Sequence, residues 1–420
     1  MLLVHNFGGV SNSQLHNFIF IRLSIIGIFS SLLVKINVIQ GLDYLIEFLF
    51  IFYTISIILR RGVLYVPKKY LCLIFFFLCT ITLNVFSSRY ATNIGLSIFG
   101  TYITFLPFLY FIFSYNYSFS ENEIVNYVDI IIKSILTITS FFYFEGIILH
   151  NHTSGRIIDS SIFAYGFVAS ICNQALILCL FLYNRLHKRK FIYLSVYFIS
   201  TIIIISQIKA VIGMLIILLI YTLYMNKNII SGFIKSFIVI SILIMTVFSI
   251  PYFNDKFNQY MVYYNVNDKS SEGTARVAMY DTAVKIAHDH FPIGTGQASF
   301  GSVPTNINYS KVYTEYNIDH IWGLRKDKHE YILDTHWAYI LGENGWLGTI
   351  IYVLLMFYTI LFQNKAISRL GNNYKFLILM TTLCMSIESF ALPLPNRIAF
   401  ISIYSGLSAI ILRYATKVNL

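Results

Sequence analysis

The chain has 420 residues, of which 57% are hydrophobic and only 12% are charged, and its mean hydropathy is +0.69. Soluble domains carry about 25% charged residues, so this composition excludes an ordinary soluble domain and indicates a protein that crosses a membrane several times. The formal net charge of +11 does not by itself indicate a nucleic-acid partner, because clusters of basic residues stand in short segments between apolar stretches.

Apolar segments recur along most of the chain, and a membrane span needs about 20 apolar residues. About twelve segments qualify, at residues 17–34, 42–59, 70–86, 94–113, 126–149, 161–183, 191–206, 209–225, 232–250, 346–363, 374–391 and 397–414. We therefore predict an all-α polytopic membrane protein with transmembrane helices 1–9 in residues 1–250. Helices 10–12 are expected in residues 346–420, after one large polar loop at 251–345.

The basic residues predict the orientation, because cytoplasmic loops carry an excess of Lys and Arg. Three short clusters fall on one side if there are twelve spans with both termini inside. They are Arg60, Arg61, Lys68 and Lys69; Arg185, Lys188, Arg189 and Lys190; and Lys365, Arg369 and Lys375. The loop 251–345 then lies on the outer side. The positive charge thus indicates topology, and no nucleic-acid partner is expected.

Neither the cysteines nor the paired histidines predict a metal site. All five cysteines lie in predicted spans, where we expect them to act as buried small apolar residues: Cys72, Cys79, Cys172, Cys179 and Cys384. The His-x-His pairs at 150/152 and 288/290 would point to different faces of a helix, and no third ligand stands nearby. We expect neither a metal nor another cofactor.

The outer loop is expected to hold two helices. Residues 274–290 show apolar residues at helical spacing, and the Phe-Pro pair that follows should end this helix. Residues 292–296 form a glycine-rich turn, and 301–333 is polar, aromatic and irregular in pattern. A second short helix is expected to start at 334 or 335, break around 342–345 and lead into the tenth span.

The two loop helices carry the residues best suited to chemistry. His336 has an ordinary pKa near 6.5 and can take a proton at neutral pH, and Glu343 shares its helix face. Arg276 lies in the first turn of the other helix, where guanidinium and helix dipole both suit phosphate. Arg156 and Lys209 add two cations on the same side. Together they predict a site with a base and an anion pocket.

Each of these residues also has a structural interpretation. A lone histidine at a helix start, such as His336, is more often a hydrogen-bonded surface residue than a catalytic one. Glu343 could equally cap the helix of the following span. Arg156 and Arg276 could extend to lipid headgroups, and Lys209 could be an interfacial anchor.

Taken in order, these motifs resemble the bacterial O-antigen polymerase (Wzy) and O-antigen ligase superfamily. Residues 335–348 (THWAYILGENGWLG) are similar to the family pattern of His, Asn, an apolar pair and Glu-x-Gly-x-x-Gly entering a span. Residues 276–300 resemble its Arg-aromatic helix followed by Pro-x-Gly-x-Gly-x-x-x-Phe. Residues 206–209 and Gly155-Arg156 resemble its Ser-Arg and Gly-Arg pairs. Lys209 stands where Arg is usual, Trp337 where Asn often follows the His, and Tyr280 where Trp is common.

The resemblance implies a GT-C-like membrane fold and a metal-independent, inverting glycosyltransferase in the bacterial inner membrane. Its donor and acceptor would be undecaprenyl-pyrophosphate-linked oligosaccharides at the outer face, and chain-length regulators are expected as partners. His336 would deprotonate the acceptor hydroxyl, with Glu343 orienting the helix that carries it. Arg276, Arg156 and Lys209 would hold the donor pyrophosphate.

Two alternatives to a surface-polysaccharide polymerase stay open. An O-antigen ligase, which transfers polymer to lipid A-core, shares the motifs. The Ile-, Phe-, Tyr- and Asn-rich composition favours the polymerase, because it is typical of variable polysaccharide gene clusters. A lipid-linked oligosaccharide flippase should place charges at mid-membrane, and the predicted spans hold few: Asp43, Glu47, Asp129, Lys133, Glu145 and Glu388.

Overall fold

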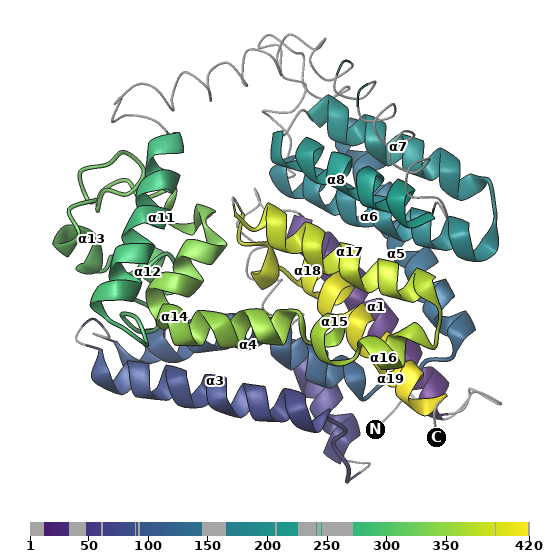
Figure 1. Ribbon diagram of the computed structural model, residues 1–420, viewed down its shortest axis with the longest axis horizontal. Helices are drawn as coiled ribbons and strands as arrows, with labels where there is room; N and C mark the ends of the chain where they lie inside the picture. The colour runs from purple at the N-terminus through teal and green to yellow at the C-terminus, as the bar shows by residue number, and fades with distance from the viewer. Residues whose placement is uncertain are drawn as a thin grey trace.

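The structure is a computed structural model that describes residues 12–32, 48–59, 62–88, 90, 93–144, 165–205, 208–225, 241, 245, 272–390 and 392–418. All regular secondary structure among these residues is helical (Figure 1). The predicted all-α class is therefore confirmed.

The longer helices are α1 (Asn12–Leu32), α3 (Lys68–Ser87), α4 (Ile94–Tyr115), α5 (Glu121–Phe144), α6 (Tyr165–Leu186), α7 (Lys190–Ile205), α8 (Ile208–Met225), α11 (Glu272–Asp289), α14 (His336–Met356), α17 (Asn372–Glu388) and α19 (Leu407–Lys417). The shorter ones are α12 (Val303–Ile307), α13 (Val312–Glu315), α15 (Tyr358–Phe362), α16 (Asn364–Ser368) and α18 (Ile398–Ile401). A π-helical turn at Ser402–Gly406 joins α18 to α19, and 3₁₀ turns occupy Ile332–Asp334 and Leu394–Asn396.

Within the described residues, six helices are long and apolar enough to cross a membrane: Lys68–Phe86, Ile94–Tyr115, Glu121–Phe144, Gly166–Leu186, His336–Met356 and Ala399–Lys417. Shorter apolar helices are Leu15–Ser30, Phe48–Leu59, Lys190–Ile205 and Ala210–Tyr224. These helices support a multi-pass membrane protein. The predicted span at 232–250 lies outside the described residues except for 241 and 245. The number of twelve spans and the sidedness of the loops stay predictions.

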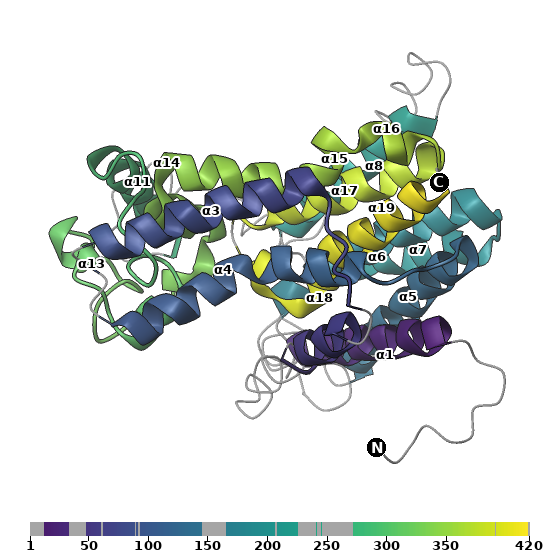
Figure 2. The ribbon, with the colours of Figure 1, turned by 90° about the horizontal axis from the view of Figure 1, so that it is seen from below.

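The helices form two groups (Figures 1 and 2). In both views α3, α4 and α14 run together, with α11, α12 and α13 at their far end, and α5–α8 form a second group. Helix α17 packs against both α6 and α8 of this second group.

The predicted inner ends of several helices meet at one end of the molecule. Glu121, which starts α5, pairs with Arg185 at the end of α6 and accepts a hydrogen bond from the Tyr374 hydroxyl of α17 at 3.2 Å. Lys69 at the start of α3 lies 5.9 Å from the ring centre of Phe362 in α15. That the three basic clusters share one side of the membrane stays a prediction.

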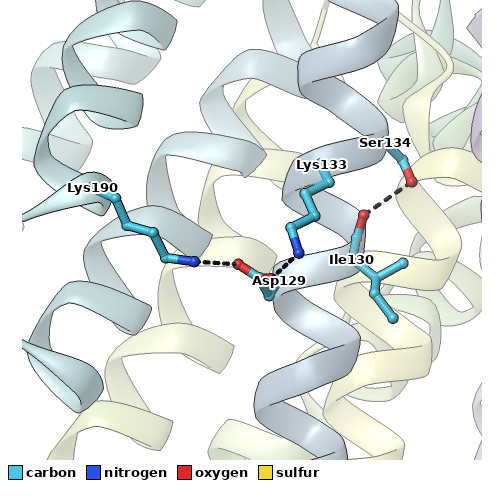
Figure 3. A network of polar contacts seen from close by, with 5 residues as sticks. All are labelled: Asp129, Ile130, Lys133, Ser134 and Lys190. Carbon is cyan, nitrogen blue, oxygen red and sulfur yellow. Dashed lines mark hydrogen bonds and ion pairs between the residues drawn. The ribbon is translucent and has the colours of Figure 1, made fainter. Parts of the chain in front are cut away.

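Asp129 and Lys133, two of the predicted interior charges, form part of a joint between helices. The Asp129 carboxylate of α5 lies 2.6 Å from Lys133 Nζ, one turn further along, and 3.4 Å from Lys190 Nζ of α7 (Figure 3). The side chains of Lys133 and Lys190 are 65% and 51% exposed, whereas that of Asp129 is 21% exposed. The carboxylate is thus neutralised by two exposed cations.

The segment 301–333, expected to be irregular, folds around a core of its own. It contributes α12, α13 and a 3₁₀ turn, which pack with α11 and the start of α14. The buried members of this second core are Tyr90, Ala275, Met279, Ala283, Ile286, Phe300, Val312, Tyr313, Ile318, Ile321, Leu324, Ile332 and Ala338. The loop is therefore a small folded unit that packs on the first residues of α14.

The cysteines are free, and the prediction that all of them are buried is wrong for two. Cys172, Cys179 and Cys384 are buried, whereas Cys79 is half-buried and Cys72 is exposed. Both exceptions lie on α3, whose outward face also carries exposed apolar side chains such as Phe75 and Phe76. That face is suited to contact with lipid, so an apolar cysteine there needs no protein neighbour.

The predicted sidedness can be tested by cysteine accessibility. In a variant with all five native cysteines replaced, Lys326→Cys in the outer loop should react with a membrane-impermeant maleimide in intact cells. Lys188→Cys, equally exposed but between α6 and α7, should react only after the membrane is opened. The reverse pattern of labelling would contradict the predicted orientation.

Candidate functional site

The site is built where the turn 292–296 docks on a break in α14. Gly345 has φ 61° and ψ −169°, so the helix cannot continue its hydrogen bonds there. The carbonyls of Gly342 and Glu343 instead accept the backbone N–H groups of Thr295 and Gly296, at 3.0 and 3.1 Å. The turn therefore satisfies groups that the break exposes, as a broken helix in a membrane protein requires.

Two glycines make this close approach possible. A Cβ atom on Gly294 would lie 2.5 Å from the backbone N of Gly345, and one on Gly345 would lie 2.5 Å from the backbone N of Gly294. Both residues also have positive φ, which glycine adopts without strain. The break expected around 342–345 is confirmed, and the partner that causes it is the glycine-rich turn.

Glu343 joins the following loop to this break. It is fully buried, and its Oε1 accepts hydrogen bonds from the N–H groups of Ser299 and Phe300 and the hydroxyl of Ser302, at 2.9, 3.0 and 2.7 Å. A carboxylate that receives three donors from one loop fixes that loop against the helix. Glu343 thus ties this loop to the helix that carries His336, and these contacts are not those of a cap for the following span. The predicted role in orienting that helix stays a prediction.

His336 begins α14 and is only 1% exposed. Its Nε2 lies 3.0 Å from the Tyr352 hydroxyl oxygen, while the rings of Tyr339 and Trp337 lie 5.5 and 5.7 Å away, centre to centre. The alternative of a surface histidine is wrong. Thr335 stands at the N-cap position, but its side chain does not cap the helix.

Arg276 lies beside the same end of α14. Its guanidinium donates to the Asp334 carboxylate at 2.8 Å, and Asp334 precedes His336 by two residues. The two side chains are 21% and 23% exposed, so the pair is partly accessible. The structure thus pairs the predicted cation with an acidic residue two positions before the predicted base, and the sequence alone did not indicate this acidic partner.

Tyr280 stands one turn after Arg276 on α11 and ties this helix to the end of α17. Its hydroxyl donates to the Phe390 carbonyl at 2.9 Å, and its ring stacks on that of Phe390 at 5.9 Å. Burial raises the pKa of Tyr280, with Arg276 acting in the opposite direction, so the hydroxyl keeps the proton that it donates.

The structure describes the two remaining predicted cations, Arg156 and Lys209, only in part. Arg156 lies outside the described residues, and of Lys209 only the backbone, the second residue of α8, is described. The adjacent carbonyl of Ala210 accepts from Asn173 Nδ2 at 2.8 Å, and the same Nδ2 lies 2.5 Å from Glu388 Oε1.

The other side of α17 faces the start of α14. The indole Nε1 of Trp337 donates to the Ser386 carbonyl at 2.9 Å, two residues from Glu388. The last turn of α17 therefore separates the backbone of Lys209 from the neighbour of His336. From the sequence, Glu388 is recognisable only as an interior charge, because nothing in the sequence shows which helices contact each other.

Of the two His-x-His pairs, only 288/290 lies in the described residues, and its two rings pack on different partners. The His288 ring packs on Trp346 at 5.7 Å and the His290 ring on Tyr90 at 5.7 Å, whereas 150/152 lie outside the described residues. In the part of the chain that is described, no three His, Cys, Asp or Glu side chains are placed to hold a metal ion.

Comparison with known families gives one match. Residues 194–353 match the family model described as O-antigen ligase. The matched segment includes Lys209, Arg276, His336 and Glu343, but not Arg156. This match confirms the resemblance to the O-antigen polymerase and ligase superfamily. No curated protein matches the chain.

The glycine contact predicts a large effect of one methyl group. Gly345→Ala should lower the free energy of unfolding by about 1–3 kcal/mol beyond the cost of its positive φ, because its Cβ meets backbone atoms that cannot move aside. Gly62→Ala is the matched control, since Gly62 has φ 64° and nothing lies within 4 Å of a Cβ there. Equal thermal-unfolding midpoints for the two purified variants would disprove this interpretation.

The role of Glu343 can be separated from its charge. Glu343→Leu leaves three donors without their acceptor, at a cost of about 1–3 kcal/mol for each buried group. Glu343→Gln keeps one acceptor oxygen, so its thermal-unfolding midpoint should stay much closer to that of the wild type. Equal destabilisation by both changes would show that the negative charge, and not the acceptor oxygen, holds the loop.

Proposed function

We propose that the chain is a surface-polysaccharide polymerase, and the match of residues 194–353 to the family model described as O-antigen ligase supports this class of chemistry. In this proposal it joins undecaprenyl-pyrophosphate-linked repeat units at the outer face of the bacterial inner membrane. The observation that carries the proposal is the ion pair of Arg276 with Asp334, two residues before His336 at the start of α14. A base beside a cation is what transfer of a sugar from a pyrophosphate requires.

The proposed reaction is a single inverting displacement. His336 takes the proton of an acceptor hydroxyl, whose oxygen attacks the anomeric carbon of the donor sugar from the face opposite the pyrophosphate. The bond between that carbon and the pyrophosphate oxygen breaks, and undecaprenyl pyrophosphate leaves with the electron pair. The leaving group is a stable anion and needs no proton, so positive charge is sufficient to stabilise it. His336 then releases its proton to water.

The proposed pyrophosphate site consists of Arg276, Arg156 and Lys209. Arg276 is oriented by Asp334, which fixes one side of the guanidinium while the planar group has five N–H donors in all. Asn173 holds the backbone next to Lys209 against the last turn of α17. These contacts support a site at the junction of α8, α11, α14 and α17.

The proposed enzyme takes its substrates from the membrane and acts with a protein partner. Donor and acceptor would enter laterally from the bilayer between helices, with both termini of the protein in the cytoplasm. Chemistry would use neither a metal nor another cofactor. A chain-length regulator would act as a protein partner, although no described residue identifies its contact surface.

An O-antigen ligase that transfers polymer to lipid A-core is the alternative within the family. Both enzymes would use the same base and cations, so the site geometry serves them equally. A flippase, the alternative from another class, is less well supported. Its translocation path should hold several charges inside the bundle. Among the described interior charges, Glu388 is buried, whereas Asp129 is neutralised by the exposed side chains of Lys133 and Lys190.

A surface-polysaccharide gel tests the proposal. Deleting the gene should reduce the polymer ladder to a band of core plus one repeat unit, and the wild-type gene should restore the ladder. His336→Ala should fail to restore it at equal protein level in the membrane, because general-base catalysis contributes about 100- to 10,000-fold. His320→Ala, an exposed histidine of the same loop, should restore it fully.

Two results would contradict parts of the proposal. A full ladder with His336→Ala would exclude His336 as the base. Loss of even the single-unit band on deletion would point to a ligase or a flippase in place of a polymerase.

A further inference from the structure

The contact between His336 and Tyr352 spans 16 residues of one helix. In a straight α-helix, which rises about 1.5 Å per residue, these two positions would lie about 24 Å apart along the axis. Their side-chain atoms are 3.0 Å apart. The bend at Gly345 is therefore what brings the second half of α14 back to the histidine that begins the first half.

Tyr352 is held in a rigid environment. It is fully buried, and its ring lies 6.0 Å from that of Phe77 in α3 and 5.0 Å from that of Phe108 in α4, both edge to face. Its ring also lies 6.1 Å from that of Trp337. Aromatic packing on several sides fixes the direction of the hydroxyl, so the hydroxyl can define the orientation of the histidine ring.

The two nitrogens of His336 are in different situations. Nε2 contacts the Tyr352 hydroxyl, whereas Nδ1 is buried and has no hydrogen-bond partner among the described residues. A neutral imidazole has one nitrogen that donates and one that accepts, and the partner of one nitrogen decides the state of the other. A buried nitrogen without a partner is costly unless a substrate group occupies the position in front of it.

We propose that Tyr352 is the positioning residue of this site. Its hydroxyl oxygen accepts a hydrogen bond from the Nε2–H group of His336, which leaves Nδ1 as the atom that takes the proton of the acceptor hydroxyl. This inference rests on the proposed function, in which His336 is the base. The Nε2–H bond to Tyr352 is kept when Nδ1 gains its proton, so the ring does not turn during the reaction. A preorganised base of this kind loses no orientation between the two protonation states.

The tautomer is tested directly on the full-length protein. Histidine labelled with ¹⁵N is incorporated, and the signals of His336 are identified by their loss in His336→Gln. The proposal expects wild-type Nδ1 to give the signal of an unprotonated nitrogen and Nε2 that of an N–H. The opposite assignment would overturn the proposal without requiring any variant of Tyr352.

Kinetics provide the second test. The purified enzyme is given lipid-linked repeat units extracted from the deletion strain, and chain extension is followed. Tyr352→Phe should reduce kcat by about 10- to 100-fold, a large part of what a positioned base contributes, while KM stays within about 2-fold. Tyr358→Phe is the control, because Tyr358 is also buried and its hydroxyl also has a partner, Gln363 at 2.8 Å.

The results separate this inference from the proposed function. If His336→Ala is inactive but Tyr352→Phe has the kcat of the wild type, Tyr352 does not position the base and only the inference fails. If His336→Ala is fully active, the base itself is wrongly assigned. Equal loss of kcat in Tyr352→Phe and Tyr358→Phe would show a general packing effect and would also overturn the inference.

Discussion

The contact between the turn 292–296 and the break in α14 is the constraint on which the rest of the site depends. The turn supplies donors for two carbonyls that the break leaves without helical partners, and two glycines allow the backbones to approach. Because α14 bends there, His336 meets Tyr352. Helix α11 ends just before the turn and packs on α14, and Arg276 in its first turn pairs with Asp334. One backbone contact therefore assembles side chains from three separate stretches of sequence.

The polar groups around this contact are buried at the end of an apolar helix bundle, where unsatisfied groups are expensive. The loop after the turn places its N–H groups on Glu343, and the amide of Asn84 in α3 donates to the carbonyls of Ile293 and Glu343. The network joins helices that the chain separates by more than two hundred residues. A rigid frame of this kind suits the proposed site, which would hold two large lipid-linked molecules in a fixed relative position.

Much of this arrangement could be predicted from the sequence because it is local. The helix expected at 274–290 is α11, Glu272–Asp289, and the break expected at 342–345 is at Gly345. The burial of His336 and its contact with Tyr352 could not be predicted, since a separation of 16 residues matches no helical neighbour. The second core escaped prediction because aromatic residues such as Tyr313 have no regular spacing in the loop.

The contact between Gly294 and Gly345 also limits how this protein can change. Each missing side chain faces backbone atoms of the other glycine, and backbone atoms are present whatever residue stands there. A larger residue at one position cannot be accommodated by a smaller residue at the other, because nothing smaller exists. The pair has no compensating substitution. We therefore expect both positions to stay glycine even where the rest of the loop varies widely in sequence.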